Sequence, residues 1–142
     1  MFHEGFVQPL DQKTADELRD RARIGRGSVL TATSLAASGH PGGSLSSMEM
    51  YTLLFHCAKL RPQEPRWDAR DRIVVSHGHT SPGVYAALSS AGFFDREEFV
   101  AHFRQARSPF EGHVERSVPG VEWSTGNLGQ GLSAGVGFAL GA

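Results

Sequence analysis

Three glycine-rich segments each carry a histidine whose side chain could do chemistry. They read SGHPGG, SHGH and EGH, and their histidines are His40, His79 and His113. An imidazole gains and loses a proton near neutral pH, so it can move protons, bind a metal ion or hold an oxyanion. Glycine lets the backbone turn sharply or approach a ligand closely. The 7 histidines and 17 glycines of the chain therefore predict loops arranged around such a site.

The SHGH segment lies where a ligand site is expected in an α/β fold. Residues 72–76 are rich in β-branched side chains and predict a short strand. His77 and His79 follow at its carboxyl end, just before a predicted helix. Ligands bind at this edge of open α/β sheets, and helix amino termini offer free N–H groups to phosphate. We therefore expect His79 to face an anionic or polarised ligand.

A zinc site is an alternative use of the same histidines. His77, His79 and His113 would supply three imidazole ligands, but a His-x-His pair with a remote histidine is not a specific pattern, and no carboxylate spacing supports it. Taken singly, His40 in a capped turn or His113 in a loop is more typical of a solvent-facing side chain than of a ligand. The residues alone leave the chemical, zinc and purely structural interpretations open.

A fourth segment, residues 119–134, ends in a pattern that formally matches a dinucleotide-binding fingerprint. Gly129, Gly131 and Ala134 have the required spacing, but a Pro-Gly turn and a Ser-Thr-Gly loop precede them where the fingerprint needs a strand. We therefore reject that interpretation. Small residues four apart, such as Gly131 and Gly135, instead predict a helix that packs closely against another element, with a ligand-contacting loop before it.

The elements that must position these segments alternate helices with a single strand. Asp11 or Thr14 is placed to cap the first helix, and Ser46 with Glu49 forms a capping box for the second. The alternation predicts an α/β fold. One strand cannot form a parallel sheet, so we expect an incomplete core and a chain that is not a stable monomer. The predicted helices are 11–35, 46–58, 81–90, 95–106 and 129–142, the strand is 72–76, and residues 108–128 form a loop.

The composition argues against several classes of protein. The chain has 142 residues, enough for one domain, and 14 basic against 15 acidic residues leave a net charge of −1. This balance argues against a broad basic face for nucleic acid or acidic membranes. The apolar runs are too short to span a bilayer, and residues 1–10, with an early Glu4, are unlike a secretory signal. The single Cys57 excludes an internal disulfide and favours a cytoplasmic protein.

The four segments together resemble a known family. The motifs SGHPGGSLS, RDRIVVSHGHTSPGVYAAL, SPFEGH and PGVEWSTGNLGQGLSAGVGFALG occur in the order and spacing of the amino-terminal region of transketolases. They are most similar to the bacterial type that is split into separate subunits. The resemblance extends from about Leu18 to Ala142. It implies an incomplete part of a thiamine diphosphate-binding α/β fold, with helices around a parallel sheet that receives few strands from residues 1–142, and no second domain.

The resemblance also implies a role for individual residues. The family binds thiamine diphosphate and transfers a two-carbon ketol unit between sugar phosphates. His40 would hydrogen-bond substrate oxygens beside the reacting carbon, and His113 would bind the terminal hydroxyl of the donor. His79, Gly126 and Leu128 would contact the cofactor, with Leu128 against its aminopyrimidine ring. Imidazoles that move protons and glycine backbone in close contact suit these roles.

The sequence departs from the family pattern at His77, where Asn or Lys is common, at Val114, where proline is common, and at Asn127, where the split type usually has Ser. None of these changes removes an implied contact. The family's metal motif, a Gly-Asp-Gly followed by Asn, is not among the 142 residues. We therefore expect the Mg²⁺ ligands and the pyrimidine-binding domain on a complementary subunit, an oligomeric assembly, and no activity from this chain alone.

Two other functions are compatible with the same segments. One is a non-catalytic fragment or interaction module that keeps the fold without binding the cofactor. The other is a subunit similar to deoxyxylulose-phosphate synthase, although His40 with Pro41 and the PGVEWSTG loop are more similar to transketolase.

Overall fold

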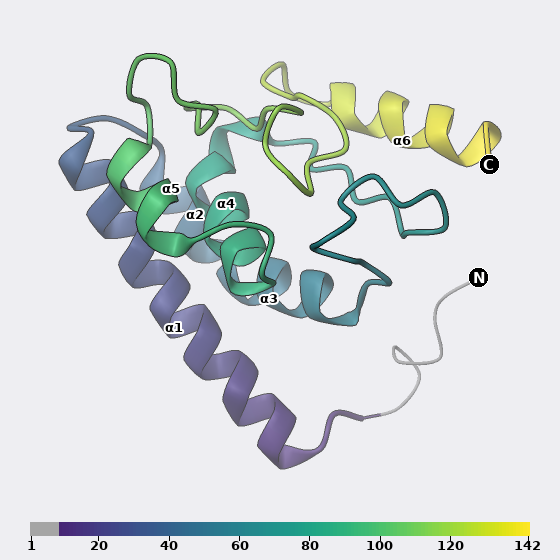
Figure 1. Ribbon diagram of the computed structural model, residues 1–142, viewed down its shortest axis with the longest axis horizontal. Coiled ribbons are helices and arrows are strands. Elements are labelled where there is room, and N and C mark those ends of the chain that lie inside the picture. The colour runs from purple at the N-terminus through teal and green to yellow at the C-terminus, as the bar shows by residue number, and fades with distance from the viewer. Residues whose placement is uncertain (1–8) are drawn as a thin grey trace.

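The computed structural model describes residues 9–142, and helices dominate this part of the chain (Figure 1). The predicted absence of a secretory signal falls mainly on residues outside this described part. No helix of the described part is long and apolar enough to cross a bilayer. The elements are α1 (Gln12–Leu35), α2 (Pro41–Ser46), α3 (Met48–Cys57), the short 3-10 turn η2 (Gly78–Thr80), α4 (Ser81–Ser90), α5 (Arg96–His102) and α6 (Gln130–Leu140).

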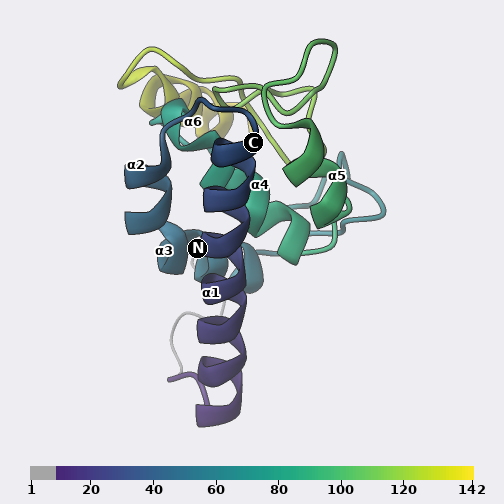
Figure 2. The ribbon, with the colours of Figure 1, turned by 90° about the vertical axis from the view of Figure 1, so that its left-hand side faces the viewer.

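Helix α1 forms one side of the molecule, and its first turns extend past the other helices (Figure 2). Asp11 caps it as predicted, because its carboxylate accepts a hydrogen bond of 2.9 Å from the Thr14 N–H. The buried face of α1 packs against α3, α4 and α5. Gly25 permits the close approach of α3, since a Cβ there would lie 2.7 Å from the Met48 sulfur.

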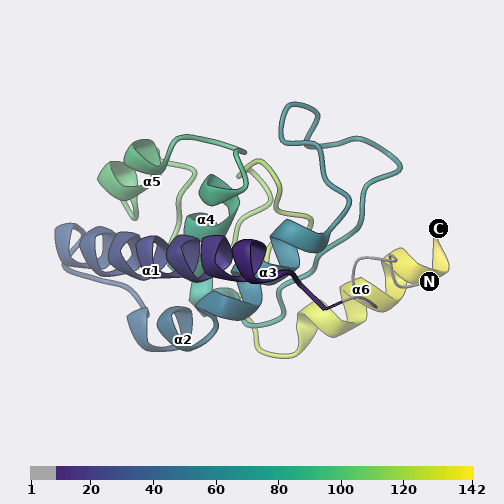
Figure 3. The same cartoon turned by 90° about the horizontal axis from the view of Figure 1, so that it is seen from below.

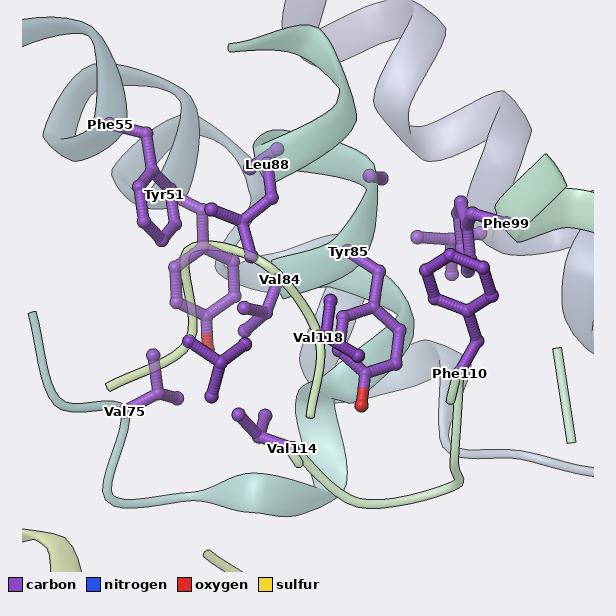
Figure 4. Packing of buried hydrophobic residues seen from close by; sticks show 14 of the residues in the cluster. Tyr51, Phe55, Val75, Val84, Tyr85, Leu88, Phe99, Phe110, Val114 and Val118 are labelled. Carbon is purple, nitrogen blue, oxygen red and sulfur yellow. The ribbon is translucent and has the colours of Figure 1, made fainter. Parts of the chain in front are cut away.

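Helix α4 is the centre of the core (Figure 4). Residues 81–88 of this helix are all buried, and the ring of Tyr85 meets those of Phe99 and Phe110 edge to face, with centroids 5.9 and 5.7 Å apart. Phe99 belongs to α5, and Phe110 belongs to the long loop between α5 and α6. This loop carries the candidate residues His113 and Gly126, so the aromatic cluster anchors one wall of the site.

The predicted strand at 72–76 is extended but is not a strand in the described structure. A strand requires a ladder of hydrogen bonds to a neighbour, and no segment within residues 9–142 lies alongside it in that way. The β-type pairing found there is one antiparallel bridge between Val114 and Thr125. Thr125 also holds the extended segment, because its hydroxyl donates to the Val75 carbonyl over 2.6 Å. The parallel sheet therefore stays a prediction.

Several predicted helix boundaries were wrong. The short helix α2 begins within the SGHPGG segment and ends at Ser46, so α3 starts at Met48 and not at Ser46. The Ser46 hydroxyl donates to the Gly43 carbonyl and does not form the predicted capping box. Helix α5 ends at His102 and not near residue 106: Phe103 leaves the helical conformation with ψ of 124°, and Arg104 follows with a left-handed φ of 56°.

A buried ion pair ties the long loop to the connector between α3 and η2. The guanidinium of Arg70 donates to both carboxylate oxygens of Glu122, over 2.5 and 2.8 Å. Both side chains are only 5% exposed. The Arg70 guanidinium also donates to the Trp67 carbonyl. Such a bidentate pair fixes the relative position of the two segments.

Helix α6 projects away from the other helices (Figures 1 and 3). It approaches the body at Gly131, where a Cβ would lie 2.5 Å from the Ser76 Cα, whereas no atom of the described residues lies near a Cβ at Gly135. The predicted close packing therefore holds for the first turn alone. Most of its apolar side chains, together with Leu128 before it, are exposed: Leu128, Leu132, Val136 and Leu140.

Candidate functional site

The fold brings the three predicted histidines into contact. The ring centroid of His79 lies 4.9 Å from that of His40 and 4.5 Å from that of His113, and both contacts are edge to face. The rings of His40 and His113 are 6.1 Å apart. Each histidine comes from a different segment: the turn before α2, the turn η2, and the loop between α5 and α6.

His40 is placed by the start of α2. It is the residue immediately before the helix, and Pro41 occupies the first helical turn, where its missing N–H costs nothing. The Ser44 hydroxyl, which is buried, donates to the His40 carbonyl over 3.0 Å. The backbone of His40 is therefore held while its ring faces the other two imidazoles.

His79 is placed by an unusually close backbone contact at its neighbour Gly78. A Cβ at Gly78 would lie 1.9 Å from the Thr125 carbonyl oxygen, so only glycine fits there. The Val114 N–H donates to the Gly78 carbonyl over 3.0 Å. The turn that carries His79 is thereby fastened to the loop that carries His113.

His113 is placed by Tyr85, a residue that the sequence analysis did not identify. The Tyr85 hydroxyl donates to the His113 carbonyl over 2.8 Å and accepts from the Glu115 N–H over 3.2 Å. Burial raises the pKa of Tyr85, which keeps the phenol protonated as a donor. A tyrosine within the otherwise apolar core helix α4 is the sequence signal that could have pointed to it, since a buried hydroxyl needs a partner.

An open cleft of about 690 Å³ lies beside the histidines. Gly126 borders the His113 ring, with 3.5 Å between that ring and the position of a Cβ. Leu128 also lines the cleft, and this residue is 74% exposed, so it offers apolar surface there. The residues that line the cleft are His79, His113, Glu115, Ser124, Thr125, Gly126, Asn127, Leu128 and Gln130.

The electrostatics of the cluster favour a neutral imidazole at His113. Burial lowers the pKa of His113 below its ordinary value of 6.5, and the nearby His79 and His40 lower it further. The Nδ1 atom of His79 is buried without a hydrogen-bond partner among residues 9–142. Buried polar atoms are normally paired, so this nitrogen points to a group that the described residues do not supply.

The predicted zinc set is not assembled. The ring of His77 turns away from the cluster and stacks on Tyr51 with centroids 6.0 Å apart, and its Nε2 lies 2.8 Å from the Tyr51 hydroxyl. Within the described residues, no three His, Cys, Asp or Glu side chains form a group that could hold a metal ion. His77 therefore does not join His79 and His113 as a ligand.

Four of the five predicted site residues thus line one cleft, namely His79, His113, Gly126 and Leu128. The fifth, His40, contacts the cleft through the rings of His79 and His113. Neutral imidazoles can accept protons from hydroxyl groups and donate hydrogen bonds to oxyanions. The exposed Leu128 offers an apolar surface to a flat ring. This arrangement suits a ligand with an apolar ring and polar or anionic groups, next to a proton-transfer centre.

Comparison with known sequences identifies relatives of the chain. Residues 19–142 match the family described as transketolase, thiamine diphosphate binding domain. The chain is 38% identical over 137 residues to a transketolase of Pongo abelii, and the match covers 96% of this chain and 22% of that protein. It is 43% identical over 129 residues to a transketolase of Treponema pallidum, covering 89% and 20%.

A further relative is itself a subunit. The chain is 38% identical over 126 residues to the 6-deoxy-6-sulfo-D-fructose transketolase subunit SqwG of a Clostridium species, covering 87% of this chain and 46% of that protein. The chain spans about a fifth of the length of the transketolases that it matches.

Solved structures have the same fold over the matched region. The crystal structure of a transketolase from Campylobacter jejuni superposes with a TM-score of 0.79 at 39% identity, over 86% of this chain and 19% of that one. A transketolase from Pichia stipitis in complex with sedoheptulose 7-phosphate gives a TM-score of 0.79 at 35% identity, over 87% of this chain and 18% of that one.

Proposed function

We propose that this protein is part of an enzyme that transfers a two-carbon ketol unit between sugar phosphates, because the chain belongs to the transketolase family through its thiamine diphosphate-binding domain. The observation that carries this proposal is the cluster of His40, His79 and His113 beside an open cleft. The fold is the α/β fold of that domain, of which residues 9–142 supply mainly helices.

The residues around the cleft fit thiamine diphosphate. His79 has a buried Nδ1 without a partner among the described residues, so a polar group of the cofactor would satisfy it. Leu128 presents an exposed apolar side chain to the cleft, suited to an aminopyrimidine ring. Gly126 would let the backbone approach the cofactor. The bound cofactor would supply a nucleophilic carbon and an electron sink, which no side chain provides.

The other two histidines would handle the sugar. His113, whose pKa is lowered, is neutral at physiological pH and can accept a proton or a hydrogen bond from a donor hydroxyl. His40 lies across the cluster from His113, so the two imidazoles can hold hydroxyl groups on either side of His79. The carbonyl contact from Tyr85 keeps the His113 backbone in place during this exchange.

The wider assembly is also part of the proposal. We assign residues 1–142 to the amino-terminal part of the diphosphate-binding domain, in which the extended residues 72–76 join a parallel sheet. Mg²⁺ ligands and the pyrimidine-binding domain would come from a complementary subunit, and the assembly would act on sugar phosphates in the cytoplasm. The exposed apolar side chains of α6 support a partner, because such a stripe is unusual on a free surface.

The experiment that tests the function uses the protein purified with the subunits that accompany it in its own cells. Calorimetry with thiamine diphosphate and Mg²⁺ should give saturable binding, and a ketose phosphate with an aldose phosphate should give exchange of two carbons. His79→Ala should weaken cofactor binding, whereas His102→Ala, which removes an exposed histidine on α5, should not. Wild-type protein that binds no cofactor would contradict the proposed function.

A further inference from the structure

The hydroxyl of Tyr51 in α3 contacts both sides of the turn that carries His79. Its oxygen lies 2.8 Å from the Nε2 of His77 and 2.5 Å from the Oγ1 of Thr80. Tyr51 and Thr80 are 3% and 4% exposed, so the bond between them is buried, whereas the bond to His77 is partly buried. The residue two before His79 and the residue directly after it are therefore tied to the same side chain.

The number of protons available defines the direction of each bond. The Thr80 hydroxyl donates to the His77 carbonyl over 2.9 Å, and it has a single proton. The contact between Tyr51 and Thr80 must then use the Tyr51 proton. The remaining contact requires the Nε2–H of His77 as donor to the Tyr51 oxygen. Only this arrangement satisfies all three contacts, and it requires a proton on the Nε2 of His77.

The same turn is held from its opposite side by backbone contacts. Gly78 packs directly on the Thr125 carbonyl, and its own carbonyl accepts from the Val114 N–H. These contacts fasten the turn to the long loop, but they do not reach α3. The hydroxyl of Tyr51 supplies the side-chain hydrogen bonds from α3 to this turn, among the residues that the structure describes.

We propose that the Tyr51 hydroxyl is a positioning group for His79, which acts through Thr80 and His77 to aim the His79 ring at the cleft. This role rests on the proposed function, because the aim of the ring matters for binding thiamine diphosphate. Tyr51 and His77 touch neither the cleft nor the other histidines of the cluster. They determine where His79 sits and do not themselves contact the ligand.

The test compares Tyr51→Phe with the matched control Ser28→Ala in the purified protein with its accompanying subunits. Both changes remove one buried hydroxyl, but the Ser28 hydroxyl bonds within α1, to the Ile24 carbonyl. The ring signals of ¹³C-labelled histidine, assigned by substitution of His79, report its surroundings by NMR. Calorimetry gives the affinity for thiamine diphosphate with Mg²⁺.

We expect Tyr51→Phe to move the His79 signal and to weaken cofactor binding about three- to tenfold, the usual effect of one neutral hydrogen bond. Ser28→Ala should change neither. His77→Gln places an amide N–H donor where the imidazole Nε2 lies, so its His79 signal and cofactor affinity should stay near those of the wild type. His77→Leu removes the donor, so it should move the signal and weaken cofactor binding as Tyr51→Phe does. The double variant Tyr51→Phe with His77→Leu should bind the cofactor at most twofold more weakly than either single variant, because both changes remove the same hydrogen bond.

An unmoved His79 signal in Tyr51→Phe would overturn the proposal, and so would a moved signal with unchanged cofactor affinity. If the wild-type protein binds no cofactor, the proposed function fails, and the His79 signal by itself then decides the positioning role. A moved signal supports that role in this case, and an unmoved signal overturns it.

Discussion

Replacing Gly78 by alanine should disrupt the site more than any other single methyl group added to it. The new Cβ would lie 1.9 Å from the Thr125 carbonyl oxygen and 2.4 Å from its carbon. The obstacle is backbone, which cannot rotate aside as a flexible side chain would. Because the φ of Gly78 lies outside the left-handed range, the cost comes from lack of space alone. Overpacking typically costs about 1–3 kcal/mol, and we expect about 3 kcal/mol here.

Urea denaturation followed by circular dichroism measures this loss, and calorimetry measures the affinity for thiamine diphosphate. The matched control is Gly27→Ala in the interior of α1, where no atom of the described residues beyond the adjacent turns of the helix lies within 4 Å of the new Cβ. That change should be neutral or should stabilise the protein by about 0.5–1 kcal/mol, because alanine loses less backbone entropy in a helix. A Gly78→Ala variant with wild-type stability and cofactor affinity would refute the argument from close packing.

Three further predictions concern charge and protonation. Glu122→Gln leaves the buried Arg70 without its counter-charge, so the free energy of unfolding should fall by about 3–5 kcal/mol in urea denaturation, and a loss below about 1 kcal/mol would contradict the buried pair. NMR titration should place the pKa of His113 below 6.5. The unfolded chain then binds the proton more readily than the folded chain does. The stability that neutral His113 contributes should therefore be complete above pH 6.5 and should be lost as the pH falls through the folded-state pKa. By calorimetry, His79→Ala should weaken thiamine diphosphate binding about ten- to hundredfold, and His77→Ala should weaken it less. The reverse order would show that the wrong histidine is assigned to the cofactor.

Local signals in the sequence determined a large part of this structure. Asp11 caps α1 as predicted, and Pro82 stands in the first turn of α4, because capping and proline geometry depend on a few neighbouring residues. The family motifs, too, are continuous stretches of sequence. Their order was enough to select His40, His79 and His113, which the fold then brings together.

Predictions that depended on distant partners were less successful. Residues 72–76 have strand-forming side chains, but a strand exists only where a neighbour supplies hydrogen bonds. Helix α5 ends at His102, because the chain must turn so that Phe103 and Phe110 can enter the aromatic core. The predicted helix 95–106 runs past this turn.

Tertiary structure alone decided which side chains support the site. Tyr85 and Tyr51 look like ordinary core residues in the sequence, and their hydroxyl groups acquire roles only where packing places them beside His113 and Thr80. The same packing turns His77 away from His79 and onto Tyr51, so the two histidines do not share the zinc set that the sequence left open. Burial, side-chain direction and the partners of a polar atom depend on segments far apart in the chain, so they emerge only when the chain has folded.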